Sequence, residues 1–147
     1  MIWPFIAAGI CGQDIVTKDI VRQKIEENEE KPVCGGKIVV TKVFNDGAML
    51  GFMGKHPQML KNMTLLMLGA LTGAMAVTSQ MDKKTLKKLG LAMMTGGAAS
   101  NAYERFVYGK VTDYIRFEAG PEKFRKLVFN TGDFAVILGS ICVALGR

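Results

Sequence analysis

Apolar residues along this chain gather in long uninterrupted blocks rather than in short periodic runs. Residues 62–81 are twenty consecutive positions without a charge, and residues 89–103 are fifteen. About 20 apolar residues in a helix cross the roughly 30 Å hydrocarbon core of a bilayer. The blocks 1–13 and 127–146 reach a similar length if one acidic residue is tolerated in each. The pattern therefore predicts four transmembrane helices, at roughly 2–20, 60–80, 87–104 and 128–146.

Charged residues lie mostly between these blocks. The chain is 49% hydrophobic, yet its formal net charge is +6. The short connection 81–88 holds four lysines against one aspartate, which is typical of a cytoplasmic loop. Both termini would then be cytoplasmic, and the connections 22–58 and 105–127 would be extracytoplasmic. We therefore expect one integral membrane domain over residues 1–147, of the all-α class.

The first apolar block has the length of a signal peptide but not its other features. No Lys or Arg precedes it and no Ala-x-Ala cleavage site follows, so we interpret it as the first membrane anchor. Cys11, Cys34 and Cys142 are too far apart for a disulfide framework or a cysteine-based metal site, and His56 is the only histidine. We expect no metal, no cofactor and no nucleic-acid partner.

Two carboxylates, Glu104 and Asp133, lie in otherwise apolar sequence in the last third of the chain. Each follows an asparagine by three residues, Asn101 in one case and Asn130 in the other. Ionisable groups at membrane depth are costly, and they persist where they have a partner, a polar pathway or a chemical role. Paired acids are the usual means of activating water. The pattern therefore predicts that Glu104 and Asp133 share one water molecule.

Asp14 is a third acid, within or at the mouth of the first block. One interpretation places it in the same carboxylate site. The other makes it the interfacial end of a shorter helix, with Lys18 one turn later as an obvious partner. The residues alone favour neither.

The connection 22–58 contains a predicted strand. Residues 37–44 are rich in β-branched side chains and follow a Gly35-Gly36 turn. A further turn from Asn45 leads into a short apolar segment that ends at residue 52. The strand either lies on the bilayer surface as a roof over the carboxylates, or it forms an ordinary extracytoplasmic hairpin.

Small residues and methionines recur at helical spacing. Gly69 and Gly73 form a Gly-x-x-x-Gly pair, and residues 96–100 are all Gly, Ala or Ser, which predicts close packing of membrane helices. A phosphate-binding loop is disfavoured because no strand precedes these glycines. Met59, Met63 and Met67 are interpreted as lipid-facing or packing residues, with a pliable groove for an acyl chain as the alternative.

Five blocks follow one another along the chain. They are Asp14-Ile15-Val16-Thr17-Lys18, Phe44-Asn45-Asp46-Gly47-Ala48-Met49-Leu50-Gly51, Gly96-Gly97-Ala98 through Asn101-Ala102-Tyr103-Glu104-Arg105, Val111-Thr112-Asp113-Tyr114, and Phe129-Asn130-Thr131-Gly132-Asp133. In this order they resemble the lipoprotein signal peptidase family, signal peptidase II, over nearly the whole chain. Ile15 stands where glutamine is usual, Leu50 replaces an aromatic residue, and Glu104 stands where the resemblance places the first catalytic aspartate.

The resemblance implies an aspartic-type intramembrane endopeptidase of the bacterial cell membrane, with four helices, a small extracytoplasmic β-cradle and its active site towards the extracytoplasmic face. Its substrates would be prolipoproteins that carry a diacylglyceryl-modified cysteine, cut just before that cysteine. Membrane lipid and globomycin-type inhibitors would be further partners. The resemblance assigns catalysis to Glu104 and Asp133. The residues expected to orient this pair or to hold the substrate are Asp14, Lys18, Asn45, Gly47, Asn101, Arg105 and Asn130.

The glutamate at position 104 leaves two outcomes open. Its extra methylene moves the carboxylate by about 1 Å, and a misplacement of that size can cost about 10²-fold in rate. Either the backbone has adapted, or the chain is a catalytically impaired homologue that binds prolipoprotein without cleaving it. A small ion- or proton-coupled transporter would also place acids in apolar sequence. The lack of an internal repeat and the gathering of the acids towards one face disfavour it.

Overall fold

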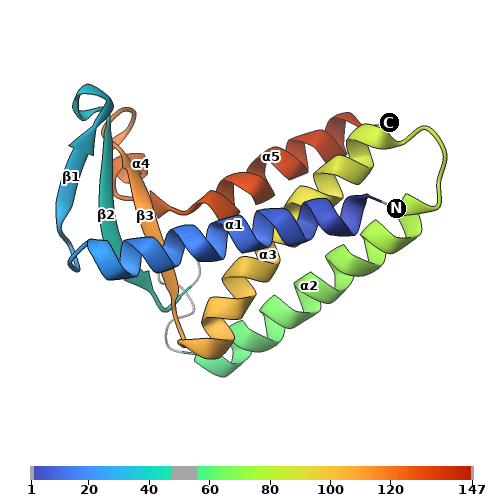
Figure 1. Cartoon of the computed structure of the whole chain (residues 1–147), viewed down its shortest axis with the longest axis horizontal. Coiled ribbons are helices and arrows are strands. Elements are labelled where there is room, and N and C mark those ends of the chain that lie inside the picture. Colours follow the sequence, from blue (N-terminus) through green and yellow to red (C-terminus); the bar gives the residue numbers. More distant parts are fainter. Residues whose placement is uncertain (1, 48–55, 147) are drawn as a thin grey trace.

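Four long helices and a small sheet make up the computed structural model, which describes residues 2–47 and 56–146. The helices are α1 (Trp3–Lys24), α2 (Pro57–Ser79), α3 (Thr85–Val107), a single turn α4 (Glu122–Arg125), and α5 (Thr131–Leu145). The four long helices occupy the four predicted blocks. Both chain ends and the α2–α3 connection lie at one end of the bundle, and the sheet lies at the other (Figure 1).

The sheet is antiparallel with the strand order β1-β2-β3-β4. Its strands are β1 (Glu30–Val33), β2 (Ile38–Asn45), β3 (Val111–Phe117) and β4 (Val128–Phe129). The strand predicted over 37–44 is confirmed as β2. It follows a one-turn 3₁₀ helix, η1 (Cys34–Gly36), in which Gly35 and Gly36 have φ of 67° and 82°, a region that glycine adopts without strain. The apolar segment after Asn45 lies mostly outside the described residues.

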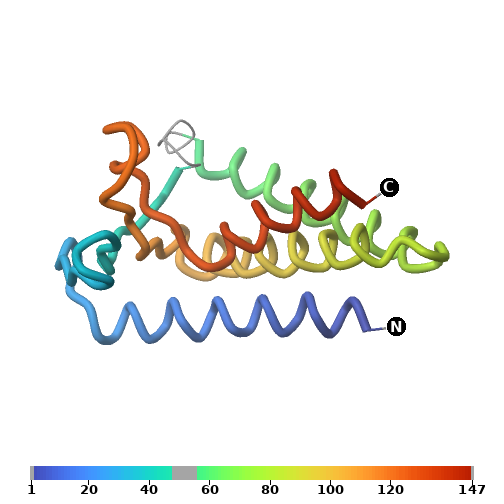
Figure 2. Tube along the Cα trace, turned by 90° about the horizontal axis from the view of Figure 1, so that it is seen from above, coloured from blue at the N-terminus to red at the C-terminus, as the bar shows by residue number. Residues whose placement is uncertain are grey.

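Helix α3 is the centre of the bundle. Figure 2 shows α1 on one side of α3 and both α2 and α5 on the other, and α3 contacts all three. Glycines make these contacts close: a Cβ on Gly96 would lie 2.6 Å from the Ala7 carbonyl oxygen, and one on Gly97 would lie 2.2 Å from that of Gly132. The prediction of small-residue packing is therefore confirmed for α3.

The same prediction is wrong for α2. A Cβ added to Gly69 or Gly73 would meet no other atom within 4 Å among the described residues. These two glycines face outwards, because α2 packs on α3 through a different face. Leu60 and Met75 are among its few buried side chains.

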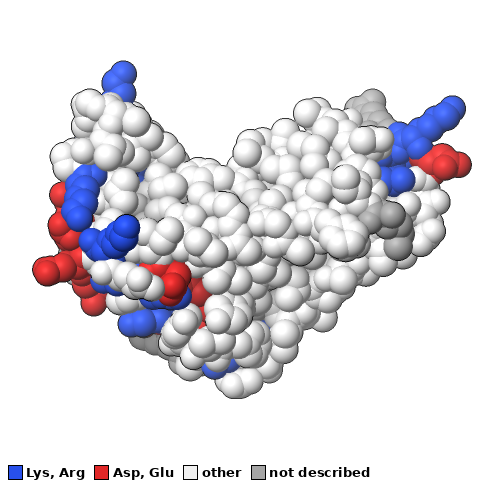
Figure 3. Space-filling model, in the orientation of Figure 1, with Lys and Arg blue, Asp and Glu red and all other residues white. Residues whose placement is uncertain are grey.

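The outer surface of the helices is apolar. Large hydrophobic side chains with more than 40% exposure include Phe5, Val16, Leu65, Leu66, Met67, Leu138 and Leu145. Figure 3 shows the charged residues gathered at the two ends of the molecule, with an uncharged band between them. By length and composition α2 alone among the described helices could cross a membrane, and α5 is apolar but has only 15 residues. Four membrane spans are therefore not confirmed by these criteria, because α1 and α3 carry several charges.

Candidate active site

The N-terminus of α5 holds the first acidic group of the site. Asn130 caps this helix: its side-chain oxygen accepts the backbone N–H of Asp133 at 2.9 Å. In return the Asp133 carboxylate accepts the backbone N–H of Asn130 at 3.0 Å. This reciprocal arrangement is a capping box, and the start of a helix also favours a negative charge. The sequence spacing Asn-x-x-Asp thus encodes a helix start as well as a site residue.

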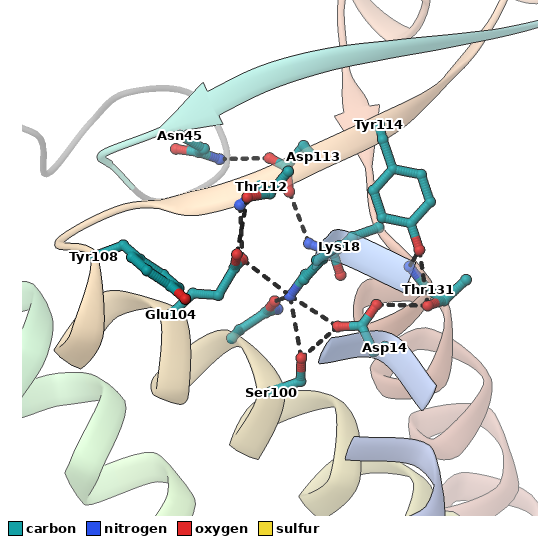
Figure 4. A network of polar contacts seen from close by, with 12 residues as sticks. Asp14, Lys18, Asn45, Ser100, Glu104, Tyr108, Thr112, Asp113, Tyr114 and Thr131 are labelled. Atoms are coloured by element: carbon teal, nitrogen blue, oxygen red, sulfur yellow. Dashed lines mark hydrogen bonds and ion pairs between the residues drawn. The ribbon is translucent and has the colours of Figure 1, made fainter. Parts of the chain in front are cut away.

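Asp113 in β3 is the second acidic group. The side-chain N–H of Asn130 donates to its Oδ1 at 2.7 Å, and the side-chain N–H of Asn45 donates to its Oδ2 at 3.0 Å. Figure 4 shows Asn45, at the end of β2, pointing at Asp113. Because Asn130 binds the carboxylates of both Asp113 and Asp133, it holds the two acids side by side.

Burial makes the Asp113 carboxylate hard to ionise. The side chain is 4% exposed. Burial first, and the neighbouring Asp133 carboxylate second, raise the pKa of Asp113 to about 7, against the opposing effects of Asn45, Asn130 and Lys18. Two adjacent carboxylates with one raised pKa hold a single proton near neutral pH. This is the state that general acid–base catalysis requires.

The amide of Asn101, in α3, points its N–H group at Asp133. Lys18 can only donate hydrogen bonds, and its Nζ donates to the Asn101 side-chain oxygen at 2.6 Å. The amide nitrogen is therefore left to donate to Asp133 Oδ1, at 3.0 Å. Asn45 is oriented in the same way, because its side-chain oxygen accepts the backbone N–H of Gly47 at 3.1 Å.

Lys18 is itself held in place by a buried network of ion pairs and hydrogen bonds (Figure 4). The Lys18 ammonium lies 2.8 Å from the Asp14 carboxylate, and both side chains are fully buried. Asp14 also accepts hydrogen bonds from Ser100, at 2.6 Å, and from Thr131. The interpretation of Asp14 as an interfacial helix end is thus wrong: it lies inside α1 (Trp3–Lys24) and connects that helix to α3 and α5.

Glu104 does not belong to this group, which corrects its expected pairing with Asp133. Its carboxylate is 1% exposed and accepts the backbone N–H of Thr112 at 2.7 Å and the Thr112 hydroxyl at 2.8 Å. It also forms ion pairs with Arg22 and, at 3.4 Å, with Lys18. Since Asn101 turns to Asp133 rather than to Glu104, the acid that the structure places beside Asp133 is Asp113.

A groove of about 790 Å³ opens over the two aspartates. Asp113, Asp133, Asn45, Asn101 and Arg105 line it, and Glu104 does not. Its apolar walls come from α2 and α5 and include Leu60, Met63, Met67, Val136 and Ile137. Two of the three methionines, Met63 and Met67, therefore line a groove, and its use by an acyl chain stays a prediction.

Arg105 lines this groove, and one of its hydrogen-bond donors is unused. Its Nη1 lies 3.4 Å from the Thr64 hydroxyl oxygen, and its Nε is buried with no partner among the described residues. A buried donor without a partner is costly, so a groove ligand with a carbonyl oxygen would be a natural acceptor.

Comparison of the sequence with known proteins matches the chain to a family. The family described as Signal peptidase (SPase) II matches residues 6–146. A lipoprotein signal peptidase of Moorella thermoacetica is 31% identical over 140 residues, covering 94% of this chain and 88% of the relative. One of Azoarcus sp. is 30% identical over 141 residues, covering 93% of this chain and 77% of the relative.

A solved structure of a bacterial membrane enzyme has a similar fold. It was determined by the in meso method at 2.3 Å and superimposes with a TM-score of 0.82 at 22% identity, covering 96% of this chain and 84% of its own. The mostly helical bundle with its small antiparallel sheet is therefore similar in fold to that bacterial membrane enzyme.

Proposed function

This chain belongs to the signal peptidase II family, and from that premise we propose that it removes signal peptides from diacylglyceryl-modified bacterial prolipoproteins, with Asp113 and Asp133 as the catalytic pair. The chain is thus an aspartic-type endopeptidase. The observation that carries the residue assignment is the meeting of two carboxylates, joined by Asn130, at the floor of an apolar groove.

The first half of the proposed reaction uses the unequal surroundings of the two acids. Asp133 lies at a helix N-terminus and its carboxylate accepts two N–H bonds, so it carries the negative charge, while buried Asp113 carries the proton. Asp133 takes a proton from a water molecule, and the water oxygen attacks the scissile carbonyl carbon. Asp113 gives its proton to the carbonyl oxygen, which yields a tetrahedral diol.

The second half restores both acids. Asp133 gives its new proton to the amide nitrogen as the C–N bond breaks, so that the cysteine amine leaves neutral. Asp113 recovers a proton from one hydroxyl group of the diol as the new carboxyl group forms. Asp113 ends protonated and Asp133 ends ionised, which is the state in which the cycle began.

The surrounding polar residues would orient the pair and the substrate. Asn45, Asn101 and Asn130 direct N–H groups at the carboxylates. Lys18 and Asp14 hold Asn101 in place, and Gly47 holds Asn45. The free donor of Arg105 would bind a substrate carbonyl. Fixing the reacting groups in this way is worth several orders of magnitude in rate.

The apolar walls of the groove fit a lipid-modified substrate. Met63, Met67 and Ile137 line the groove and remain partly exposed, so they would contact the diacylglyceryl chains and the surrounding membrane lipid. A cyclic lipopeptide inhibitor of the globomycin type would occupy the same groove. Its peptide carbonyls would accept from Arg105.

The four long helices would each cross the cell membrane, in one domain over residues 1–147. The uncharged band of Figure 3 supports this arrangement, because on the face shown it lies between two charged ends of the molecule. The lysine-rich connection 81–88 and both termini would be cytoplasmic. The sheet and the catalytic pair would face the extracytoplasmic side, as the β-cradle of the active site.

Cysteine labelling in whole cells tests this orientation. Cys34 is an exposed, free thiol at the sheet end. A membrane-impermeant maleimide is expected to label Cys34 from outside. A Lys84→Cys variant that also carries Cys34→Ser is expected to react only after the membrane is permeabilised. Labelling of Lys84→Cys in intact cells would invert the topology.

Cleavage of a purified prolipoprotein tests the activity itself. The protein is expected to shorten a diacylglyceryl-modified precursor and to leave the same precursor without the lipid intact. Because Asp113 has to be protonated, kcat/KM is retained below its pKa and falls as the pH rises through about 7, up to about tenfold per pH unit. The charged groups facing Asp113 are Asp133, Lys18 and Arg105. A profile that rises through pH 7 to 9 would mean that Asp113 is not the acid.

The alternative of an impaired homologue loses its main support. It rested on the longer side chain of Glu104, which lies outside the groove and is bound to Thr112 and Arg22. Both members of the proposed catalytic pair are aspartates.

A further inference from the structure

Glu104 occupies a junction between three elements rather than a place in the groove. It lies near the C-terminus of α3 (Thr85–Val107) and faces α1 and β3. Its two carboxylate oxygens receive the Thr112 backbone N–H, the Thr112 hydroxyl, and the cations Arg22 and Lys18. A carboxylate offers about four lone-pair sites, so these donors leave none for a catalytic water.

Arg22 is itself held in a fixed place. Its guanidinium carbon lies 4.3 Å from the centre of the Tyr108 ring, and its Nη2 lies 3.1 Å from an Asp19 oxygen. The guanidinium therefore approaches Glu104 from a defined direction at the end of α1. A planar, stacked cation of this kind is not replaced by lysine without loss.

Thr112 transmits this arrangement to the catalytic pair. It directly precedes Asp113 in β3, where it pairs with Phe44 of β2 while Asp113 pairs with Val43. Asp133 is fixed independently, by the start of α5. The position of β3 along the end of α3 therefore sets how closely Asp113 approaches Asp133.

We infer that Glu104 and Arg22 are a matched pair of positioning residues, which hold Thr112 and so place the Asp113 carboxylate against Asp133. The longer side chain of glutamate is what allows one carboxylate to reach both Thr112 and Arg22. An aspartate would fall short of one of them by about 1 Å. The inference rests on the proposed function of Asp113 and Asp133, and it explains why a glutamate stands at a position where the family resemblance predicts aspartate.

Steady-state kinetics of three single variants test the inference. Glu104→Asp, Arg22→Met and Thr112→Val are each expected to lower kcat about ten- to hundredfold, with KM within about twofold of wild type because none of the three residues lines the groove. Thr112→Ser keeps the hydroxyl group and is expected to retain the wild-type kcat. The double variant Glu104→Asp with Arg22→Met is expected to lose little more than either single variant.

The pH profile separates positioning from mere stability. A displaced Asp113 is less affected by the Asp133 charge, so the upper limb of the kcat/KM profile moves to lower pH in the three variants. A loss of folded protein would instead lower kcat/KM equally at every pH and leave the pH of its upper limb unchanged. Arg116→Met is the matched control, because Arg116 lies in the same strand as Thr112. The substitution removes the ion pairs of Arg116 with Glu30 and Glu118, and both kcat and the pH profile of kcat/KM are expected to stay unchanged.

Three results would overturn the inference. They are wild-type kcat in Glu104→Asp and Thr112→Val, a reduced amplitude with an unmoved limb, and a loss in Glu104→Gln as complete as that in Asp113→Asn. If Asp113→Asn cleaves normally, the proposed catalytic pair fails instead. If Asp113→Asn is inactive while the Glu104, Arg22 and Thr112 variants resemble wild type, only the positioning role fails.

Discussion

Asp113→Asn is expected to abolish prolipoprotein cleavage, by more than about 10³-fold in kcat. Asparagine has nearly the size of aspartate but cannot carry the proton that the scissile carbonyl oxygen receives. The new amide oxygen still accepts from one of the two donors, Asn45 and Asn130, which lie at 3.0 and 2.7 Å, while the new N–H₂ group faces the other, so the loss reports chemistry only where the variant remains folded. The measurement is the size shift of a diacylglyceryl-modified prolipoprotein in single-turnover conditions, with folding checked by thermal unfolding in detergent.

Two matched variants identify the catalytic acids. Asp133→Asn is expected to lose as much as Asp113→Asn, and the double variant little more, because the two acids act as one unit. Glu104→Gln is expected to keep measurable cleavage, at about one tenth to one hundredth of wild type. Full loss in Glu104→Gln together with near-normal cleavage in Asp113→Asn would restore the pairing of Glu104 with Asp133.

Lys18→Met is expected to destabilise the protein by about 3–5 kcal/mol, since it leaves buried carboxylates without their shared cation. The Lys18 ammonium contacts Asp14 at 2.8 Å and Glu104 at 3.4 Å, and all three side chains are at most 1% exposed. For a chain of this size the loss corresponds to about 10 °C in the thermal midpoint. Cleavage is expected to fall as well, because Asn101 would no longer be held with its N–H group towards Asp133.

A double variant and a surface control sharpen this test. Asp14→Asn in the Lys18→Met background removes the stranded charge and is expected to recover part of the lost stability. Lys24→Met, at the exposed end of α1, is expected to stay within about 0.5 kcal/mol of wild type. Equal thermal midpoints for Lys18→Met and Lys24→Met would show that the buried network contributes nothing.

Much of the architecture follows from local sequence. The apolar blocks predict the four long helices, since a run of uncharged side chains in a helix needs no distant partner to be recognised. The β-branched run at 37–44 predicts β2, and Gly35-Gly36 predicts the turn before it. The Asn130-to-Asp133 spacing contains its own capping box, so its local geometry is set within four residues.

Local reasoning singled out Glu104 as the partner of Asp133, whereas the acid we propose for this role is Asp113. Glu104 stands out in sequence because it interrupts an apolar helix, whereas Asp113 lies in a polar connection that reads as a loop. In the folded chain their surroundings differ: Glu104 forms ion pairs with Arg22 and Lys18 from α1, whereas Asp113 accepts hydrogen bonds from two side-chain amides and lies beside the Asp133 carboxylate. The Val111-to-Tyr114 block was a usable signal, because an acid within β-branched and aromatic residues fits a buried strand.

The sequence by itself determined the helices, one strand, the family resemblance and one member of the proposed pair, Asp133. Only the tertiary structure decided which acid joins it, because charge neutralisation and desolvation depend on neighbours far away in the chain. Arg22 and Lys18 reach Glu104 across 82 and 86 residues, and Asn45 reaches Asp113 across 68. A carboxylate paired with two cations is held as a structural anion, while one buried beside another carboxylate retains a proton that it can donate.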